Sequence, residues 1–160
     1  MTSATTQQVV TFRLGNDQFA VDIGAVVRVL RYSQPTAVPR LPEWIEGVID
    51  YEECAVPVID LRKRFGLRPV APRLETRIIV FTTGDEWIGT VVDAVLEVTT
   101  ITPEQLTPPP TLFRGLSADY LRGLVRTGRR ILIFLEISRL LTATERLELQ
   151  RATEQGSRDV

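Results

Sequence analysis

The sequence predicts a mostly β protein of two small barrels packed around one shared core, with an α-helix at the C-terminal end. Three observations predict this fold. The stretch from Val10 to Val29 returns in character from Ile79 to Val98, 69 residues later. The stretch that begins at Gly47 returns from Gly123, 76 residues later. Both copies consist of short apolar–polar alternations separated by turn residues, a pattern typical of small barrels.

We expect a single domain over residues 9–150 in which each copy of the repeat forms one barrel subdomain, approximately residues 9–66 and 76–136. The first copy follows a flexible N-terminus, residues 1–8. Apolar residues alternate with polar ones on both sides of Gly15 and again around Glu52, which indicates two β-hairpins. Asp60 caps a short helical turn that ends at Gly66. The two hairpins cover residues 12–23 and 47–59. Between them we expect a strand over 26–30 and a helical turn at 43–46.

The second copy covers residues 76–136 and follows a proline-containing connection over residues 68–75. Its expected elements are strands over 76–83, 87–92 and 94–99, a proline-stiffened loop over 107–110, and a hairpin over 120–135 around Gly128. Apolar residues then keep helical spacing, which predicts an α-helix over 137–150 that covers one face of the core. Residues 151–160 are expected to form a frayed tail.

The composition limits the classes of function that the protein can have. The chain has 160 residues, no histidine and a net charge of −1, and Cys54 is its only cysteine. The usual general base and the usual zinc ligands are therefore missing, and we expect no catalytic site, no metal and no cofactor. The sequence contains neither a secretory signal nor an apolar run of about 20 residues, which favours a cytoplasmic protein.

Two alternative interpretations of the polar residues are weaker. Asp22, Asp60 and Asp93 could form a catalytic carboxylate pair, but structural roles as capping and turn carboxylates are favoured for all three. Two basic patches suggest nucleic-acid binding, yet few aromatic residues lie between the cationic ones, as stacking on bases would require. The patches consist of Arg62, Lys63, Arg64 and Arg68, and of Arg122, Arg126, Arg129 and Arg130.

The order and spacing of several motifs resemble the CheW family of chemotaxis coupling proteins from about Val9 to Leu141. The motifs are FAVDI (19–23), PRLPEWIEGVI (39–49), VPVIDLRKRFG (56–66), IGTVVDAVLEV (88–98) and Gly123-Leu124. The resemblance implies two five-stranded SH3-like barrels around the shared core. It also implies a noncatalytic adaptor that binds the CheW-like regulatory domain of a CheA-type histidine kinase and the cytoplasmic tip of methyl-accepting chemoreceptors.

The resemblance also indicates which residues contact the partners. By motif position, the groove that binds the receptor is expected to include Val27, Arg28, Tyr51, Glu52, Val95 and Glu97. An alternative function keeps the adaptor role but places it in a pilus or developmental signalling array with a divergent receptor. A nucleic-acid-binding small barrel is the less favoured alternative, because the same fold serves unrelated functions.

Two charges in this sequence are opposite to those usual in the family. Glu52 stands where the family commonly has an arginine, and Arg28 stands where it commonly has an acidic residue. One hypothesis is that the two side chains form a swapped ion pair beside the groove and change the choice of partner. The other interpretation is that they are two unrelated, solvated charges.

Overall fold

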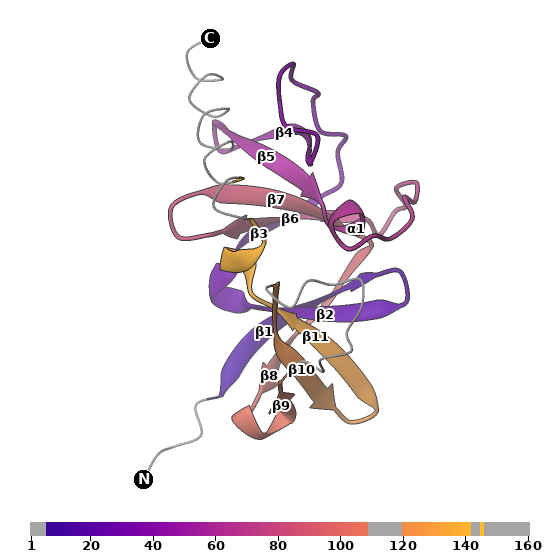
Figure 1. Cartoon of the computed structure of the whole chain (residues 1–160), viewed down its shortest axis with the longest axis vertical. Helices are drawn as coiled ribbons and strands as arrows, with labels where there is room; N and C mark the ends of the chain where they lie inside the picture. Colours follow the sequence, from indigo (N-terminus) through magenta and orange to yellow (C-terminus); the bar gives the residue numbers. More distant parts are fainter. Residues whose placement is uncertain (1–5, 109–119, 142–144, 146–160) are drawn as a thin grey trace.

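The computed structural model describes residues 6–108, 120–141 and 145, and the protein is almost entirely β within them (Figure 1). The mostly β class predicted from the sequence is confirmed. The strands are β1 (Gln7–Leu14), β2 (Asp17–Asp22), β3 (Val26–Arg31), β4 (Ile45–Tyr51), β5 (Cys54–Asp60), β6 (Arg77–Thr82), β7 (Trp87–Val92), β8 (Ala94–Ile101), β9 (Leu106–Thr107), β10 (Leu121–Thr127) and β11 (Arg130–Leu135). The helical segments are η1 (Ile23–Ala25), α1 (Leu61–Arg64), η2 (Pro103–Gln105) and η4 (Ile137–Arg139).

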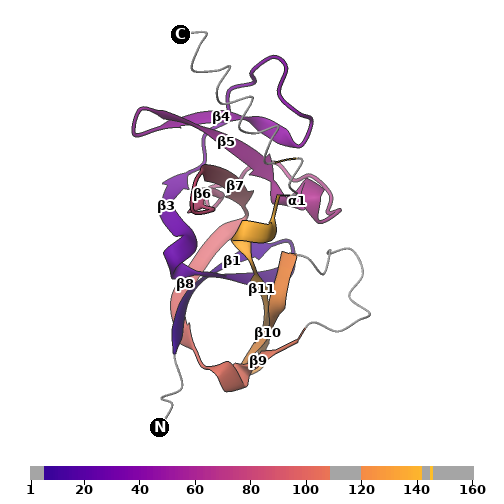
Figure 2. The ribbon, with the colours of Figure 1, turned by 60° about the vertical axis from the view of Figure 1, so that its left-hand side comes forward.

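The strands form two sheets, each in its own lobe (Figures 1 and 2). One sheet has six strands in the order β8-β1-β2-β11-β10-β9, and the other has five in the order β3-β6-β7-β5-β4. We call them the six-stranded lobe and the five-stranded lobe. The expectation of five strands in each holds for the second, while the first gains the two-residue strand β9 beside β10.

Each sheet combines strands from both copies of the repeat. The six-stranded sheet takes β1 and β2 from the first copy and β8 to β11 from the second, while the five-stranded sheet takes the complementary set. Residues 9–66 and 76–136 are therefore the copies of the repeat and not the two lobes. The copies meet in equivalent parallel pairings, with Ala20 opposite Phe134 in one sheet and Gly89 opposite Val58 in the other. The fold thus has an approximate two-fold symmetry.

The largest apolar cluster joins the two lobes and supplies the expected shared core. Phe12 and Phe19 of the six-stranded sheet pack with Phe81 and Ile88 of the five-stranded sheet, and all four side chains are buried. The rings of Phe12 and Phe19 stack with centroids 5.5 Å apart, and the rings of Phe19 and Phe65 stack at the same distance. Each such side chain contributes about 1.5–3 kcal/mol by its burial, so the lobes stabilise each other.

Gly47 and Gly123, which begin the second repeated block, lie where another segment approaches the strand closely. A Cβ atom on Gly47 would lie 2.5 Å from the carbonyl oxygen of Thr36, and one on Gly123 would lie 2.3 Å from that of Thr107. Both glycines adjoin register shifts, in the β4–β5 and β10–β11 pairings respectively. Any side chain at these positions would separate the strand from its neighbour.

Two expected helices differ in the structure. The helical turn at residues 43–46 is wrong: β4 already begins at Ile45, whose N–H donates to Pro42 O at 3.0 Å and closes a turn. No α-helix from Ile137 is seen in the described residues, which form the three-residue helix η4 there. Ile137, Leu140 and Leu141 are all buried in the shared core, as the predicted helical spacing requires. Glu145 is described and has an α-helical backbone, while residues 142–144 and 146–150 of the predicted helix and the tail over 151–160 lie outside the described residues.

The sheet also begins earlier than the sequence predicted. Gln7 and Gln8, assigned to the flexible N-terminus, pair with Ile101 and Thr100 of β8. Their side chains carry no apolar signal, but the backbone continues the ladder that β1 forms with β8. The first five residues of the chain lie outside the described part.

Candidate partner-binding surfaces

Val27 and Arg28 lie on β3, an edge strand of the five-stranded sheet. Val27 is the extra residue of a bulge, because Val26 pairs with Phe81 and Arg28 with Val80. The half-buried Val27 side chain packs against the apolar cluster of this lobe, whereas Arg28 is exposed. The bulge therefore points the Val27 side chain toward the apolar cluster and leaves the Arg28 guanidinium exposed beside it.

Tyr51 and Glu52 lie at the tip of the β4–β5 hairpin in the same lobe. The Tyr51 ring is half-buried, and its centroid is 5.6 Å from that of Trp87 in a tilted arrangement. Glu52 and Glu53 occupy both turn positions with φ angles of 50° and 64°. This left-handed backbone favours Gly and Asn, and each non-glycine residue held there costs on the order of 1 kcal/mol.

Val95 and Glu97 lie on β8, an edge strand of the six-stranded sheet. Val95 packs against the shared core. Glu97 accepts from Arg130 at 2.8 Å, and its backbone N–H and carbonyl both bond the Thr11 hydroxyl at 3.2 Å. Glu97 is thus fixed by its own lobe, at the position that corresponds to Arg28 in the repeat.

The structure groups the six residues by lobe. Val27 and Tyr51 pack against one apolar cluster in the five-stranded lobe, while Val95 and Glu97 belong to the six-stranded sheet. Within the described part of the chain, Arg28 and Glu52 form no ion pair with each other. They extend from β3 and from the β4–β5 turn, at the two ends of the strand order. The described part of the isolated protein therefore contains no Arg28–Glu52 contact that would support the swapped-pair hypothesis.

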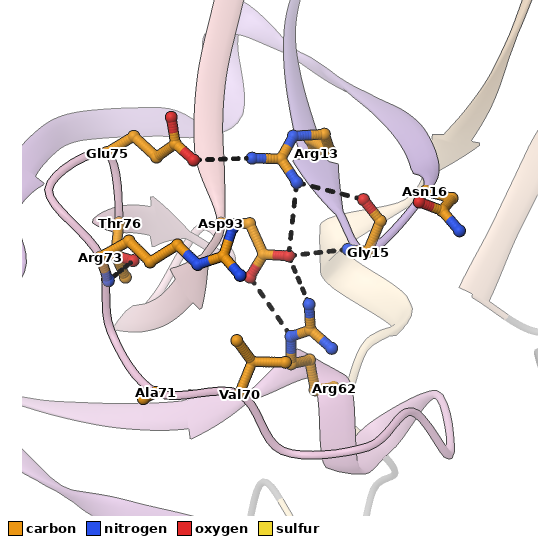
Figure 3. Close-up of a pocket in the computed structure, with 10 residues that line it drawn as sticks. All are labelled: Arg13, Gly15, Asn16, Arg62, Val70, Ala71, Arg73, Glu75, Thr76 and Asp93. Atoms are coloured by element: carbon orange, nitrogen blue, oxygen red, sulfur yellow. Dashed lines mark hydrogen bonds and ion pairs between the residues drawn. The ribbon is translucent and has the colours of Figure 1, made fainter.

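Sequence reasoning missed a cluster of charges that joins the lobes around Asp93 (Figure 3). The Asp93 carboxylate accepts from Arg62 Nε at 3.2 Å, from Arg62 Nη2, and from the backbone N–H of Gly15 at 2.7 Å. Arg13 lies 3.9 Å from Asp93 and donates to Glu75 at 3.1 Å. The cluster therefore ties α1, the β1–β2 turn, the β7–β8 junction and the connection before β6 together. It surrounds a cavity of about 210 Å³.

The only sequence signal for this cluster was a difference between the copies. Gly24 of the first copy corresponds to Asp93 of the second, and Thr82 of the second copy corresponds to Arg13 of the first. The charged residues therefore occur on only one side of the approximate symmetry. Burial by itself would raise the pKa of Asp93. Hydrogen bonds from Arg62 and the Gly15 N–H, with the charges of Arg62 and Arg13, lower its pKa below the ordinary value. Asp93 is thus an ionised acceptor at neutral pH, and its role is structural.

The other candidate carboxylates are caps. Asp22 accepts from the N–H of Gly24 and Asp60 from that of Arg62, each at 2.9 Å, which confirms the capping interpretation. The described residues contain no group of three or more His, Cys, Asp or Glu side chains placed to hold a metal ion. No described helix is long and apolar enough to cross a membrane.

Comparison with known proteins identifies the family. The model of the CheW-like domain matches residues 8–145, which include the six expected contact residues and the cluster around Asp93. The chain belongs to the CheW family. The resemblance found in the sequence motifs is therefore confirmed, and membership makes the protein a noncatalytic scaffold of chemotaxis signalling.

Individual CheW proteins are similar over most of their length. The chemotaxis protein CheW of Klebsiella aerogenes is 37% identical over 139 residues, 87% of this chain and 84% of that protein. Protein FrzA of Myxococcus xanthus is 34% identical over 145 residues, 88% of this chain and 89% of that protein. The crystal structure of scaffolding protein TtCheW from Thermoanaerobacter tengcongensis superposes with a TM-score of 0.79 at 30% identity, over 88% of this chain and 91% of that chain.

Proposed function

We propose that this CheW-family chain couples methyl-accepting chemoreceptors to a CheA-type histidine kinase in the cytoplasm. One end of the two-lobed body binds the CheW-like regulatory domain of the kinase. The receptor tip binds beside the edge strands β3 and β8 and recruits the protein to membrane-associated arrays. The proposed contact residues are Val27, Arg28, Tyr51, Glu52, Val95 and Glu97.

The exposed apolar side chains on these two edge strands support the proposal most directly. Val29 on β3 is 38% exposed, and Leu96 and Val98 on β8 are 41% and 56% exposed. Both strands run along the same side of the molecule in Figure 2. Edge strands normally carry charges that prevent association, so apolar residues there indicate a surface that a partner covers. The apolar face of a helical hairpin at the receptor tip fits this requirement.

A matched pair of variants tests the receptor surface. Val29→Glu places a charge on β3, and Val38→Glu places one on a loop residue that is also 38% exposed. Isothermal titration with a purified receptor tip fragment should give a Kd in the micromolar range, equivalent to about 8 kcal/mol. Val29→Glu should weaken binding at least tenfold, while Val38→Glu should match the wild type. Equal affinities for both variants would contradict the proposed surface.

The second candidate is an adaptor of a pilus or developmental array with a divergent receptor. The opposite charges at Arg28 and Glu52, relative to those usual in the family, favour it, because a like charge against the wrong partner weakens binding. Parallel titrations with tip fragments of both receptor classes, and with the kinase regulatory domain, distinguish the candidates. Binding to the kinase domain and to chemotaxis receptors supports the first. Binding to the other receptor class alone supports the second.

A further inference from the structure

We propose that the cavity around Asp93 binds a small organic carboxylate, which the Arg73 guanidinium recognises. The cavity lies at the junction of the two lobes, and the connection before β6 forms one of its walls (Figure 3). Its described lining includes none of the six residues proposed to contact the receptor. The site is therefore separate from the coupling surfaces.

The cavity carries one positive charge more than it has carboxylates to balance. Asp93 pairs with Arg62 and Arg13, and Glu75 pairs with Arg13. Arg73 also lines the cavity, and within the described part of the chain its side chain forms no ion pair or hydrogen bond. Three arginines thus face two carboxylates, and the unbalanced charge is that of Arg73.

The backbone of Arg73 is fixed while its side chain is free to bind. Its N–H donates to the Thr76 hydroxyl at 2.8 Å, and the Thr76 N–H donates back to Arg73 O at 3.1 Å. Thr76 is buried, so this turn is held firmly. From it the Arg73 side chain extends toward Asp93 (Figure 3). A guanidinium has five N–H groups in a planar fork, which binds a carboxylate through two parallel hydrogen bonds.

The approximate two-fold symmetry provides an internal comparison for the cavity. A second cavity, of about 290 Å³, lies at the equivalent junction of the repeat. Three of its lining residues are the counterparts of Arg13, Gly15 and Asp93 in the first cavity, namely Thr82, Gly84 and Gly24. The fold therefore leaves a cavity at both junctions.

The second cavity has the opposite balance of charge. Arg122 is the one arginine in its described lining, and it pairs with Glu136 at 3.3 Å. Asp22 also lines this cavity, so carboxylates exceed cations there. Since the equivalent junction forms without an unpaired arginine, packing of the lobes does not explain Arg73. Recognition of an anion does.

The size and the walls of the first cavity define the class of ligand. Pockets for drug-sized molecules measure about 300–1,000 Å³, so a cavity of about 210 Å³ admits a smaller molecule. Val70 and Ala71 give it an apolar wall, against which a short aliphatic chain can pack. One unbalanced positive charge matches a monocarboxylate better than a doubly charged phosphate, because a charge without a partner is costly to desolvate. Butyrate meets all three requirements.

A ¹H–¹⁵N NMR titration of the full chain with sodium butyrate, at pH 7 and constant ionic strength, tests the proposal. A ligand of this size should bind with a Kd on the order of 1 mM. The backbone amides of Gly15, Arg73 and Thr76 should shift and saturate together. The amides of Gly24 and Gly84, beside the second cavity, are the control in the same spectrum and should not shift.

Two variants and a second anion test the role of Arg73. Arg73→Gln should weaken butyrate binding by about tenfold or more, because it removes the charged hydrogen bonds. Arg68→Gln is the matched control, since Arg68 is an exposed residue of the same connection that does not line the cavity, and its Kd should equal that of the wild type. Inorganic phosphate should bind the wild type more weakly than butyrate.

Any of four results would overturn the proposal: no saturable shift up to 50 mM butyrate, equal shifts beside both cavities, equal effects of Arg73→Gln and Arg68→Gln, or phosphate bound as tightly as butyrate. If Arg73→Gln fails to fold by circular dichroism, Arg73→Lys replaces it and should also weaken binding, because lysine keeps the charge but lacks the fork. The titration uses this chain alone, so its outcome is independent of whether the chain binds a kinase or a receptor.

Discussion

Replacement of Asp93 by asparagine tests whether the charge cluster holds the two lobes together. The substitution keeps the size of the side chain and an acceptor for the Gly15 N–H, but it removes the charge that Arg62 and Arg13 face. The side chains of Asp93 and Arg62 are only 19% and 12% exposed, so water replaces the lost contact poorly.

The expected loss of unfolding free energy is about 2–3 kcal/mol. Hydrogen bonds between charged groups contribute about 1.5–3 kcal/mol, and Arg62 loses its carboxylate partner in a partly buried site. The 3.9 Å contact with Arg13 is more exposed and adds less than about 1 kcal/mol. For a chain of this size, the melting temperature should fall by about 5–10 °C.

Urea unfolding followed by tryptophan fluorescence measures the loss, and its pH dependence identifies the cause. The folded pKa of Asp93 is lower than its unfolded value, which is about 3.9. The stabilisation is therefore fully present above the unfolded pKa and is lost as the pH falls through the folded one. The difference between wild type and Asp93→Asn should be constant from pH 7 to about pH 5 and should shrink at lower pH.

Glu75→Gln is the matched control in the same cluster. Among the described residues, Glu75 forms an ion pair with Arg13 alone, and its side chain is 53% exposed, so its loss should cost no more than about 1 kcal/mol. The reasoning is refuted if Asp93→Asn costs no more than Glu75→Gln, or if its effect is unchanged at pH 3.

Two further tests address the close approach at Gly123 and the strained turn at Glu52 and Glu53. Gly123→Ala should lower the free energy of unfolding in urea by at least about 2 kcal/mol, because its Cβ would lie 2.3 Å from Thr107 O. The control is Gly128→Ala, which has open space around its Cβ and should cost about 1 kcal/mol through backbone strain alone. Glu52→Asn combined with Glu53→Gly should raise the unfolding free energy by about 1–2 kcal/mol, since these residues suit the positive φ angles. A stability equal to the wild type would show that the turn is not strained.

The sequence by itself determined the local elements of this protein. Alternation around Gly15 and around Glu52 predicted two hairpins, and both are present as β1–β2 and β4–β5. The cap at Asp60 was also predictable, since a capping carboxylate lies two residues from the N–H that it accepts. These features depend on neighbours within a few residues, which the sequence pattern displays directly.

The tertiary structure alone decided how the copies combine. Each strand pattern allowed pairing within its own copy, yet β2 pairs with β11 and β7 with β5. Parallel pairings of this kind join segments far apart in sequence, and local alternation contains no information about them. The same exchange brings Asp93 to Arg62 and Gly15. The repeated sequence pattern thus determined which strands form. Long-range packing determined which strands pair with each other, because each lobe buries its apolar faces with strands of both copies.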